Sequence, residues 1–271
     1  MRQEVLNKLH NTLIEIMDEI ERVCKDAGIT YYLTGGTLLG AIRHHGFIPW
    51  DDDMDIMIPR ADYERFCSIF SSLASSNYFL LSNETDTQYW KSHAKVCKRG
   101  TVYLENAERS QSIFVDVFPL DEASKKNGLF QKMRFSLIKA CDRIVCYRLY
   151  KGYNPGQAKL LCYLTIAFPI NWIRVFQKRL MMLKKHKYDC YFVYEISGVY
   201  GSDRSLWPKL DFGQKEFAQF EGREYIIPSG FDRILSITYH DYMQLPPVEK
   251  RRTHNPIRLS FDVNGPDEIL D

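Results

Sequence analysis

The chain has 271 residues, of which 45% are hydrophobic, 14% aromatic and 26% charged, and its formal net charge is +2. This composition is typical of a globular protein with ample apolar material for a core, and the near-neutral charge does not indicate a nucleic-acid partner. The seven cysteines form no Cys-x-x-Cys pair, which disfavours a zinc site or disulfide framework and favours buried thiols in a reducing compartment. The amphipathic N-terminus does not match a signal peptide, so we expect a cytoplasmic protein.

The N-terminal half alternates between helical and extended patterns. The first helix is predicted by a single apolar stripe with charged residues opposite. The elements expected over this half are helices at 2–27, 36–44 and 60–74 and strands at 31–34, 53–58, 78–81, 93–97, 101–104 and 113–118. The strand at 101–104 is expected to pair with the one at 93–97 through a turn at Arg99–Gly100, and Pro119 is expected to end the last strand.

From about residue 128 the pattern becomes mainly helical. The expected elements are helices at 128–150, 157–187 and 230–243, a short strand or helix at 191–196, and a hairpin with arms at 217–220 and 223–227. The hairpin turns at Glu221–Gly222. Ser229 and Asp232 have the spacing of a capping pair for the last helix.

Four aspartates lie within five residues, at Asp51, Asp52, Asp53 and Asp55, immediately before the apolar run 56–58. Side chains two residues apart in a strand point to the same face, so Asp51, Asp53 and Asp55 are predicted to share one face. Two carboxylates about 5 Å apart repel by roughly 3 kcal/mol at an effective dielectric of about 20. A hard divalent cation, most often Mg²⁺ with Mn²⁺ as the alternative, would offset this repulsion. A solvated acidic loop is the competing interpretation.

A glycine pair, Gly35–Gly36, follows the strand predicted at 31–34 and precedes helical spacing from Thr37 onward. A helix N-terminus presents free backbone N–H groups and a partial positive charge, and both favour a phosphate. Arg43, one or two turns further on, is placed to add a bidentate phosphate contact. A Gly-Gly pair alone is usually an ordinary turn. Together with the acidic strand that follows, it predicts a site for a metal ion and a phosphate group.

Asp116 is the single charge in the apolar strand predicted at 113–118. A lone carboxylate there is costly unless it is paired or bound to a metal. We therefore expect this strand to lie beside the acidic one and to bring Asp116 to the same cation, where it could also accept the proton of an attacking hydroxyl. Lys95, in the strand at 93–97, is the second expected phosphate ligand after Arg43. A turn-forming aspartate and a solvated lysine are the competing interpretations.

Several longer stretches closely resemble the LicD family of phosphotransferases. The resemblance runs from about residue 20 to residue 254 and is most specific in the N-terminal motif. The stretches that carry it are Gly35–Arg43, Gly46–Ile56, Phe114–Leu120, Phe220–Arg223 and Tyr239–Pro247, with Lys250, Arg251 and His254 behind. One departure is His240, which stands where the family motif has glycine.

The resemblance implies an α+β fold, in which a nucleotidyltransferase-like mixed sheet is flanked by helices and followed by a C-terminal helical extension. The implied organisation is an N-terminal helix packing on the core (1–27), a nucleotidyltransferase-like catalytic core (28–125), a mainly helical extension with a small hairpin (126–255) and a loose tail (256–271).

The resemblance also implies the roles of the site residues. Asp53, Asp55 and Asp116 are the implied catalytic carboxylates, and they bind the metal together with Asp51. Gly35, Gly36 and Thr37 hold the donor, with Arg43 and Lys95 as the further phosphate contacts expected above. The implied reaction transfers phosphocholine, or a polyol phosphate of the ribitol or glycerol type, from a CDP-activated donor to a hydroxyl of a surface glycan or its lipid-linked precursor, and releases CMP. The alternatives are a nucleotidyltransferase acting on a small molecule and a non-catalytic binding protein on the same fold.

The segment Leu160–Phe176 is apolar, but Pro169 and Asn171 interrupt it, and a bilayer span needs about 20 apolar residues. Basic residues follow it, at Lys178, Arg179, Lys184, Lys185 and Lys187. An apolar stretch with a basic flank suits an anionic membrane surface, where a lipid-linked acceptor would be presented. One expectation is therefore peripheral contact with the inner face of a membrane. A core helix with a solvated basic end is the other.

Overall fold

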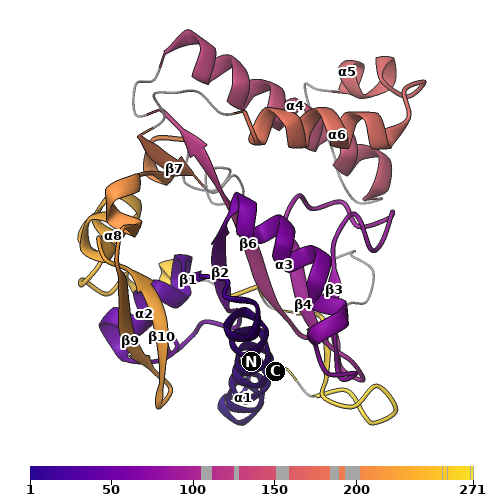
Figure 1. The fold of residues 1–271 in the computed structure, drawn as a ribbon. Coiled ribbons are helices and arrows are strands. Elements are labelled where there is room, and N and C mark those ends of the chain that lie inside the picture. Colours follow the sequence, from indigo (N-terminus) through magenta and orange to yellow (C-terminus); the bar gives the residue numbers. More distant parts are fainter. Residues whose placement is uncertain are drawn as a thin grey trace.

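The computed structural model describes residues 1–104, 112–124, 128–150, 159–183, 189–192, 202–251, 253–254, 256–268 and 270. Its centre is a mixed sheet of seven strands with helices packed around it (Figure 1). This confirms the α+β class predicted from the sequence. No helix in the described part of the chain is both long enough and apolar enough to cross a membrane.

The pairing of two sheet strands positions the site. The strands run in the order β1 (Tyr32–Leu33), β2 (Asp55–Pro59), β6 (Phe114–Ala123), β4 (Ala94–Lys98) and β3 (Tyr78–Leu81), while β7 (Cys190–Phe192) pairs with the far end of β6 and β8 (Leu206–Pro208) pairs with β7. β2 and β6 are parallel, and the other pairings in this sheet are antiparallel. The acidic strand and the strand that carries Asp116 are therefore direct neighbours, as predicted.

Three helices pack on the sheet and its flanks. α1 (Gln3–Ala27) buries its whole apolar stripe against β4 and β6, and α3 (Arg60–Leu73) packs on β2, β3 and β6. Both match the predicted spans closely, and Gly28 ends α1 in the left-handed conformation. α2 (Gly35–His44) packs on β2 and on the hairpin strand β9.

The predicted hairpin is present as β9 (Lys215–Phe220) and β10 (Arg223–Pro228). Glu221 and Gly222 both have positive φ, at 50° and 73°, which is the backbone signature of a tight type I′ turn. The hairpin packs on β1 and α2, so this late part of the chain supports the N-terminal motif.

The strand at 102–104 pairs differently from the prediction. β5 (Val102–Leu104) pairs with β11 (Arg258–Ser260) and not with β4, because β3 and β6 already occupy both edges of β4. The expectation of a loose tail is therefore wrong at 258–260, where Leu259 is fully buried. The tail returns to the core and closes a second small sheet.

Pro119 does not end β6, which continues to Ala123. The N–H of Asp116 donates to the carbonyl of Met54 beside β2, so by alternation the nitrogen of Pro119 faces the other side of the strand. On that side, pairing with β4 has already ended and pairing with β7 has not begun. The sheet tolerates the proline because no hydrogen bond is needed there.

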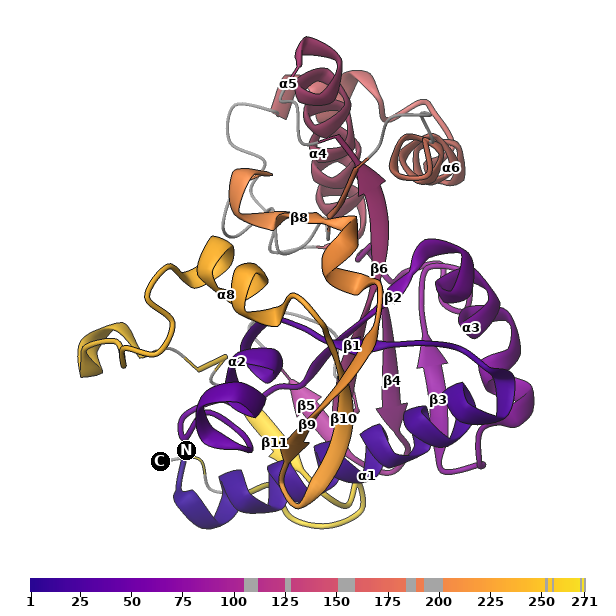
Figure 2. The ribbon, with the colours of Figure 1, turned by 60° about the vertical axis from the view of Figure 1, so that its left-hand side comes forward.

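A helical lobe stands beyond the end of β6 (Figure 2). It consists of α4 (Leu129–Leu149), α5 (Lys159–Leu164) and α6 (Ile170–Met181). The single helix predicted at 157–187 is thus two helices, because Pro169 cannot continue α5 and instead precedes the first turn of α6. Lys184, Lys185 and Lys187 lie outside the described residues.

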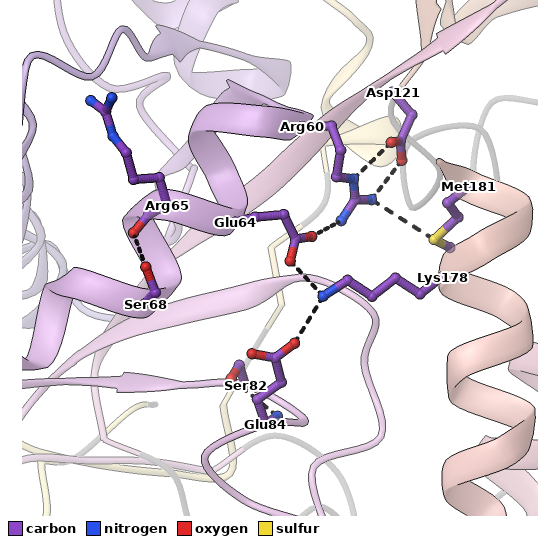
Figure 3. Close-up of polar contacts among 9 residues, drawn as sticks. All are labelled: Arg60, Glu64, Arg65, Ser68, Ser82, Glu84, Asp121, Lys178 and Met181. Carbon is purple, nitrogen blue, oxygen red and sulfur yellow. Dashed lines mark hydrogen bonds and ion pairs between the residues drawn. The ribbon is translucent and has the colours of Figure 1, made fainter. Parts of the chain in front are cut away.

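Ion pairs lie where the lobe meets the core. Arg60 on α3 donates from Nε and Nη2 to the two carboxylate oxygens of Asp121 on β6, at 2.7 and 2.6 Å. Lys178 on α6 reaches both Glu64 on α3 and Glu84 after β3 (Figure 3). These contacts fix which face of α6 points to the core.

The C-terminal part contains α8 (Phe231–Tyr239) and the 3₁₀ turns η2 (Ser202–Ser205), η3 (Lys209–Phe212) and η4 (Val248–Lys250). α8 lacks the predicted capping pair, since its N-cap residue is Gly230 and the Ser229 hydroxyl donates to the carbonyl of Asp211. The helix begins later and ends earlier than the predicted 230–243.

Candidate active site

The acidic residues gather at one end of the β2–β6 pair. Asp55 and Asp116 are direct partners in the parallel register. Asp51 and Asp53 are not on the strand as predicted, because β2 begins only at Asp55 and the residues before it have no regular structure. They come from the loop that enters β2, and their charges interact with that of Asp55.

The glycine pair is what allows α2 to approach these carboxylates. Gly35 and Gly36 form the first turn of α2, rather than a turn before it, and Gly35 has a φ of +57°. A Cβ atom on Gly36 would lie 2.6 Å from Oδ2 of Asp51, and one on Gly35 would lie 3.0 Å from Oδ2 of Asp55. Only glycine therefore permits this contact without displacing a carboxylate.

Thr37 fixes the start of β2. Its hydroxyl oxygen accepts a hydrogen bond from the backbone N–H of Asp55 at 2.8 Å, and it is buried. The positive end of the α2 dipole lies beside Asp51 and Asp55 as a result. The predicted donor-binding residues Gly35, Gly36 and Thr37 are thus all brought to the acidic cluster.

Burial and mutual repulsion dominate the electrostatics of three of the carboxylates. Burial, followed by the charge of Asp53, raises the pKa of Asp51 well above its usual range. Burial, followed by the charges of Asp53 and Asp116, does the same to the pKa of Asp55. The pKa of Asp53 is also raised by burial, against the pull of His254. The cluster carries more negative charge than the surrounding protein balances.

Asp116 behaves in the opposite way. Burial acts to raise its pKa, but the charges of Lys95 and His93 outweigh burial and lower the pKa of Asp116 far below the usual range. His93 Nε2 lies 2.9 Å from Oδ1 of Asp116, and Lys95 Nζ lies 3.7 Å from the same oxygen. Asp116 is therefore held as a fixed anion.

Lys95 is placed inside the protein rather than at a substrate surface. It is fully buried, and its ammonium lies 3.1 Å from the centre of the Phe114 ring as well as near Asp116. This favours a role in holding Asp116 ionised over the predicted direct contact with a phosphate. His93 and Lys95, two residues apart in the chain, both reach this carboxylate.

Arg43 is directed at the C-terminal segment. Among the described residues, its hydrogen bonds go to His44, at 3.0 Å, and to the backbone carbonyls of Tyr242 and Gln244, at 2.7 and 3.5 Å. These contacts join α2 to the chain after α8. These contacts give Arg43 a structural role. The phosphate contact predicted for Arg43 stays a prediction.

A second group at this site was not predicted. Asp52 is buried, accepts hydrogen bonds from the backbone N–H of His254 at 3.0 Å and from the Tyr103 hydroxyl at 3.3 Å, and lies 3.1 Å from His254 Nδ1. The same ring nitrogen lies 3.6 Å from Oδ2 of Asp53. These partners come from β5 and the C-terminal segment, and no local sequence pattern links them to Asp52. They close the C-terminal segment over the acidic loop.

The chemistry of the donor set fits a hard divalent cation. All the donor atoms are carboxylate oxygens, which such a cation prefers. Burial and mutual repulsion raise the pKa values of Asp51, Asp53 and Asp55, and a cation would relieve that repulsion. In the described part of the chain, however, no three His, Cys, Asp or Glu side chains converge closely enough to hold an ion as they stand. The predicted ligands are brought to one edge of the sheet without being closed into a coordination shell.

Comparison with known proteins finds the same domain. Residues 28–140 match the family described as "LicD/FKTN/FKRP, nucleotidyltransferase domain". The lipopolysaccharide cholinephosphotransferase LicD of Haemophilus influenzae is 27% identical over 94% of this chain and 97% of its own length. The ribitol 5-phosphate transferase FKRP of Homo sapiens is 56% identical over 36 residues, which are 13% of this chain and 7% of that protein. An uncharacterised protein of Rickettsia typhi is 34% identical over 31% of this chain and 27% of its own length.

The mixed sheet, the glycine pair and the paired aspartates therefore define a nucleotidyltransferase-type domain. Residues 28–140 match the LicD family, and the similarity to the LicD protein of Haemophilus influenzae extends along most of the chain. The named relatives are phosphotransferases, and the comparisons support that enzyme class for this chain.

Proposed function

We propose that this protein transfers phosphocholine, or a polyol phosphate of the ribitol or glycerol type, from a CDP-activated donor to a hydroxyl of a cell-surface glycan or its lipid-linked precursor, with release of CMP. The reaction would depend on Mg²⁺, with Mn²⁺ as the alternative. Support comes from the named activities of the relatives and from the acidic edge of the sheet.

The single observation that carries the proposal is the meeting of Asp55, Asp116 and the N-terminus of α2. A phosphate that accepts hydrogen bonds from this helix end would lie directly against the carboxylates of Asp51 and Asp55. Two anions in that position need a cation between them. When bound, the cation would neutralise the charge that develops on the donor diphosphate as it splits.

The residues of the site divide into two groups by charge state. Asp116 is held ionised by Lys95 and His93, which suits a permanent ligand and disfavours the proton-accepting role predicted for it. Asp51, Asp53 and Asp55 have raised pKa values and are the better candidates to take the proton of the attacking hydroxyl. The α2 N-terminus would orient the donor by its backbone N–H groups.

The test follows CMP release with Mg²⁺ from CDP-choline, CDP-ribitol and CDP-glycerol, each with and without a glycan acceptor extract. We expect acceptor-dependent CMP release from one of the three donors. In parallel, pyrophosphate release is measured from CTP and ATP. Pyrophosphate without CMP release would assign the chain to nucleotidyl transfer instead, and no turnover with any donor in the presence of either metal would remove the proposed function.

A further inference from the structure

The helical lobe exposes many large apolar side chains. They come from all three helices and from the loop at 165–169, and they are Phe130, Met133, Leu137, Leu160, Tyr163, Leu164, Ile166, Phe168, Trp172, Val175 and Phe176. Trp172 and Leu160 are each 69% exposed. Apolar patches of this extent on a globular protein mark a surface that meets a partner.

The orientation of α6 shows that this exposure is built in. Trp172, Val175, Phe176 and Arg179 recur at helical spacing, so they form one outward stripe. On the other side, Lys178 is paired with Glu64 and Glu84 (Figure 3). Arg174, on the same side of the helix, donates to the carbonyl of Tyr89 at 2.6 Å. α6 is therefore held by its polar face and presents its apolar face to solvent.

An apolar cavity lies between α4 and α6, next to this stripe. Its volume is about 350 Å³, and its lining includes Leu137 and Ile144 of α4, Phe168 of the loop, and Trp172 and Phe176 of α6. Among the described residues, no acidic or basic side chain lines it. A hydrocarbon chain is the ligand chemistry that such a lining accepts.

The charge of the lobe is strongly one-sided. Its described residues, 129–150 and 159–183, hold one acidic residue, Asp142, against nine basic ones: Lys132, Arg134, Lys139, Arg143, Arg148, Lys159, Arg174, Lys178 and Arg179. Arg134 and Arg174 are buried and Lys178 pairs with the core, which leaves six whose charge lies at or near the surface. An anionic partner matches this surface.

Several backbone groups of the exposed loop at 165–169 form hydrogen bonds within the protein. The N–H groups of Ile166 and Phe168 donate to the carbonyls of Tyr163 and Thr165, each at 3.1 Å. The carbonyl of Phe168 accepts from Arg148 at 2.6 Å. A loop that enters the apolar part of a lipid layer loses its water partners, so internal hydrogen bonds of this kind are what it requires.

We propose that the outer face of the lobe docks on an anionic phospholipid membrane, with the outward stripe of α6, α5 and the loop at 165–169 in the headgroup region and a lipid acyl chain in the cavity between α4 and α6. The docking surface is separate from the acidic site and does not depend on the donor assigned to it. Apolar insertion and electrostatic attraction to anionic lipid both contribute to such binding.

Co-sedimentation of the full chain with vesicles tests the docking surface. We expect binding to mixed phosphatidylcholine–phosphatidylglycerol vesicles at low salt, and much weaker binding to pure phosphatidylcholine. The triple substitution K132Q, R143Q and R179Q should weaken binding to the mixed vesicles about a hundredfold, since each basic residue near the headgroups contributes roughly fivefold. Trp172→Glu combined with Phe168→Glu should weaken it at least about tenfold.

The matched control is Leu210→Glu with Phe217→Glu. These side chains are also large, apolar and exposed, at 69% and 59%, but they lie outside the lobe. The control should bind vesicles as the unaltered protein does. Equal loss in both double variants would mean that the vesicles meet general apolar surface, and it would overturn the assignment to the lobe.

Two further measurements keep the outcome decisive. The fluorescence of Trp172 should shift to shorter wavelength on vesicles, and Trp172→Phe should retain binding but lose that shift. Sedimentation velocity without lipid tests the other occupant of the face, a second copy of the chain. A dimer that Trp172→Glu dissociates, together with protein that stays in the vesicle supernatant, would overturn membrane docking in favour of self-association.

Discussion

The acidic edge of the sheet and the helical lobe use charge in opposite ways. At the acidic edge, like charges are brought together and are balanced only in part, by the α2 N-terminus, His93, Lys95 and His254. In the lobe, basic side chains stand at the surface beside apolar ones, where solvation makes each charge inexpensive. Clustered carboxylates lower the free energy of unfolding.

This difference predicts where activity and stability separate. Substitutions at the acidic edge should remove activity while leaving stability unchanged or improved, because they relieve repulsion. Substitutions on the outer face of the lobe should change neither turnover of a soluble donor nor stability, and should act on surface binding alone.

The largest effect is expected for Asp55→Asn or Asp53→Asn. Each removes a carboxylate ligand from a site whose cation supplies several kcal/mol of transition-state stabilisation, so CMP release should fall by roughly a thousandfold or more. The melting temperature should stay the same or rise, because one repelling charge is lost. Asp26→Asn, at an exposed position on α1, is the control and should keep full activity. Activity near that of the unaltered protein in Asp53→Asn and Asp55→Asn would exclude the proposed metal site.

A smaller but more specific effect is expected for Gly36→Ala. The new Cβ would lie 2.6 Å from Oδ2 of Asp51, and the end of that side chain can move aside at little cost in stability. Alanine is also the better helix former by about 1 kcal/mol. We therefore predict activity lowered about tenfold to a hundredfold with no loss of melting temperature. Gly213→Ala, where a Cβ would meet a carbonyl oxygen at 3.4 Å, is the control. A destabilised but fully active Gly36→Ala protein would contradict the role given to the glycine pair.

Metal and pH should act on the same carboxylates. The folded-state pKa values of Asp51 and Asp55 are raised, so their ionisation destabilises the fold at neutral pH, and this loss is recovered as pH falls through the raised values. The lowered pKa of Asp116 has the opposite effect, because the ionised form of this carboxylate stabilises the fold. This stabilisation is lost only when the pH falls below the usual carboxyl range. Without metal, the melting temperature should therefore rise on mild acidification from neutral pH.

Mg²⁺ at about a hundred times its Kd should add about 2.7 kcal/mol to the free energy of unfolding at neutral pH. A melting temperature insensitive to Mg²⁺ would count against the cation.

The sequence predicts those parts of the fold and of the site that local patterns encode. The stripe of α1, the hairpin turn at Glu221–Gly222 and the pairing of the Asp55 and Asp116 strands all follow from spacing, or from a charge in an apolar run. The contact of Asp52 with His254 joins residues 202 positions apart, and neither residue carries a local signal for it. The prediction of a partner for β5 is wrong for a similar reason. β3 and β6 occupy both edges of β4, which is a property of the whole sheet, and β5 pairs with β11 instead.

Arg43→Lys separates a structural from a substrate-binding arginine. Lysine cannot reproduce the planar fork that bonds both His44 and the Tyr242 carbonyl, so we expect a loss of about 1 kcal/mol, or about 2–4 °C in melting temperature. The KM for the donor should be unchanged. Arg99→Lys is the matched control, because Arg99 also donates to a backbone carbonyl, that of Ser76, away from the site. A raised KM in Arg43→Lys alone would instead support the phosphate contact predicted from the sequence.

The smallest effect is expected at His240, where the family motif has glycine. His240 follows α8 with φ 63° and ψ −114°, a conformation that side chains with a Cβ rarely adopt, and its side chain is exposed. His240→Gly should relieve about 1 kcal/mol of strain, offset in part by the greater freedom of glycine in the unfolded chain. His240→Ala keeps the Cβ and should give no gain, so the difference in urea midpoint between the two variants isolates the backbone effect. Turnover should be the same in both variants. His240 is linked to the acidic site through the segment 242–244, whose backbone carbonyls accept hydrogen bonds from Arg43. An alanine variant as stable as the glycine variant would show that the backbone at 240 is unstrained and that the motif glycine serves another purpose.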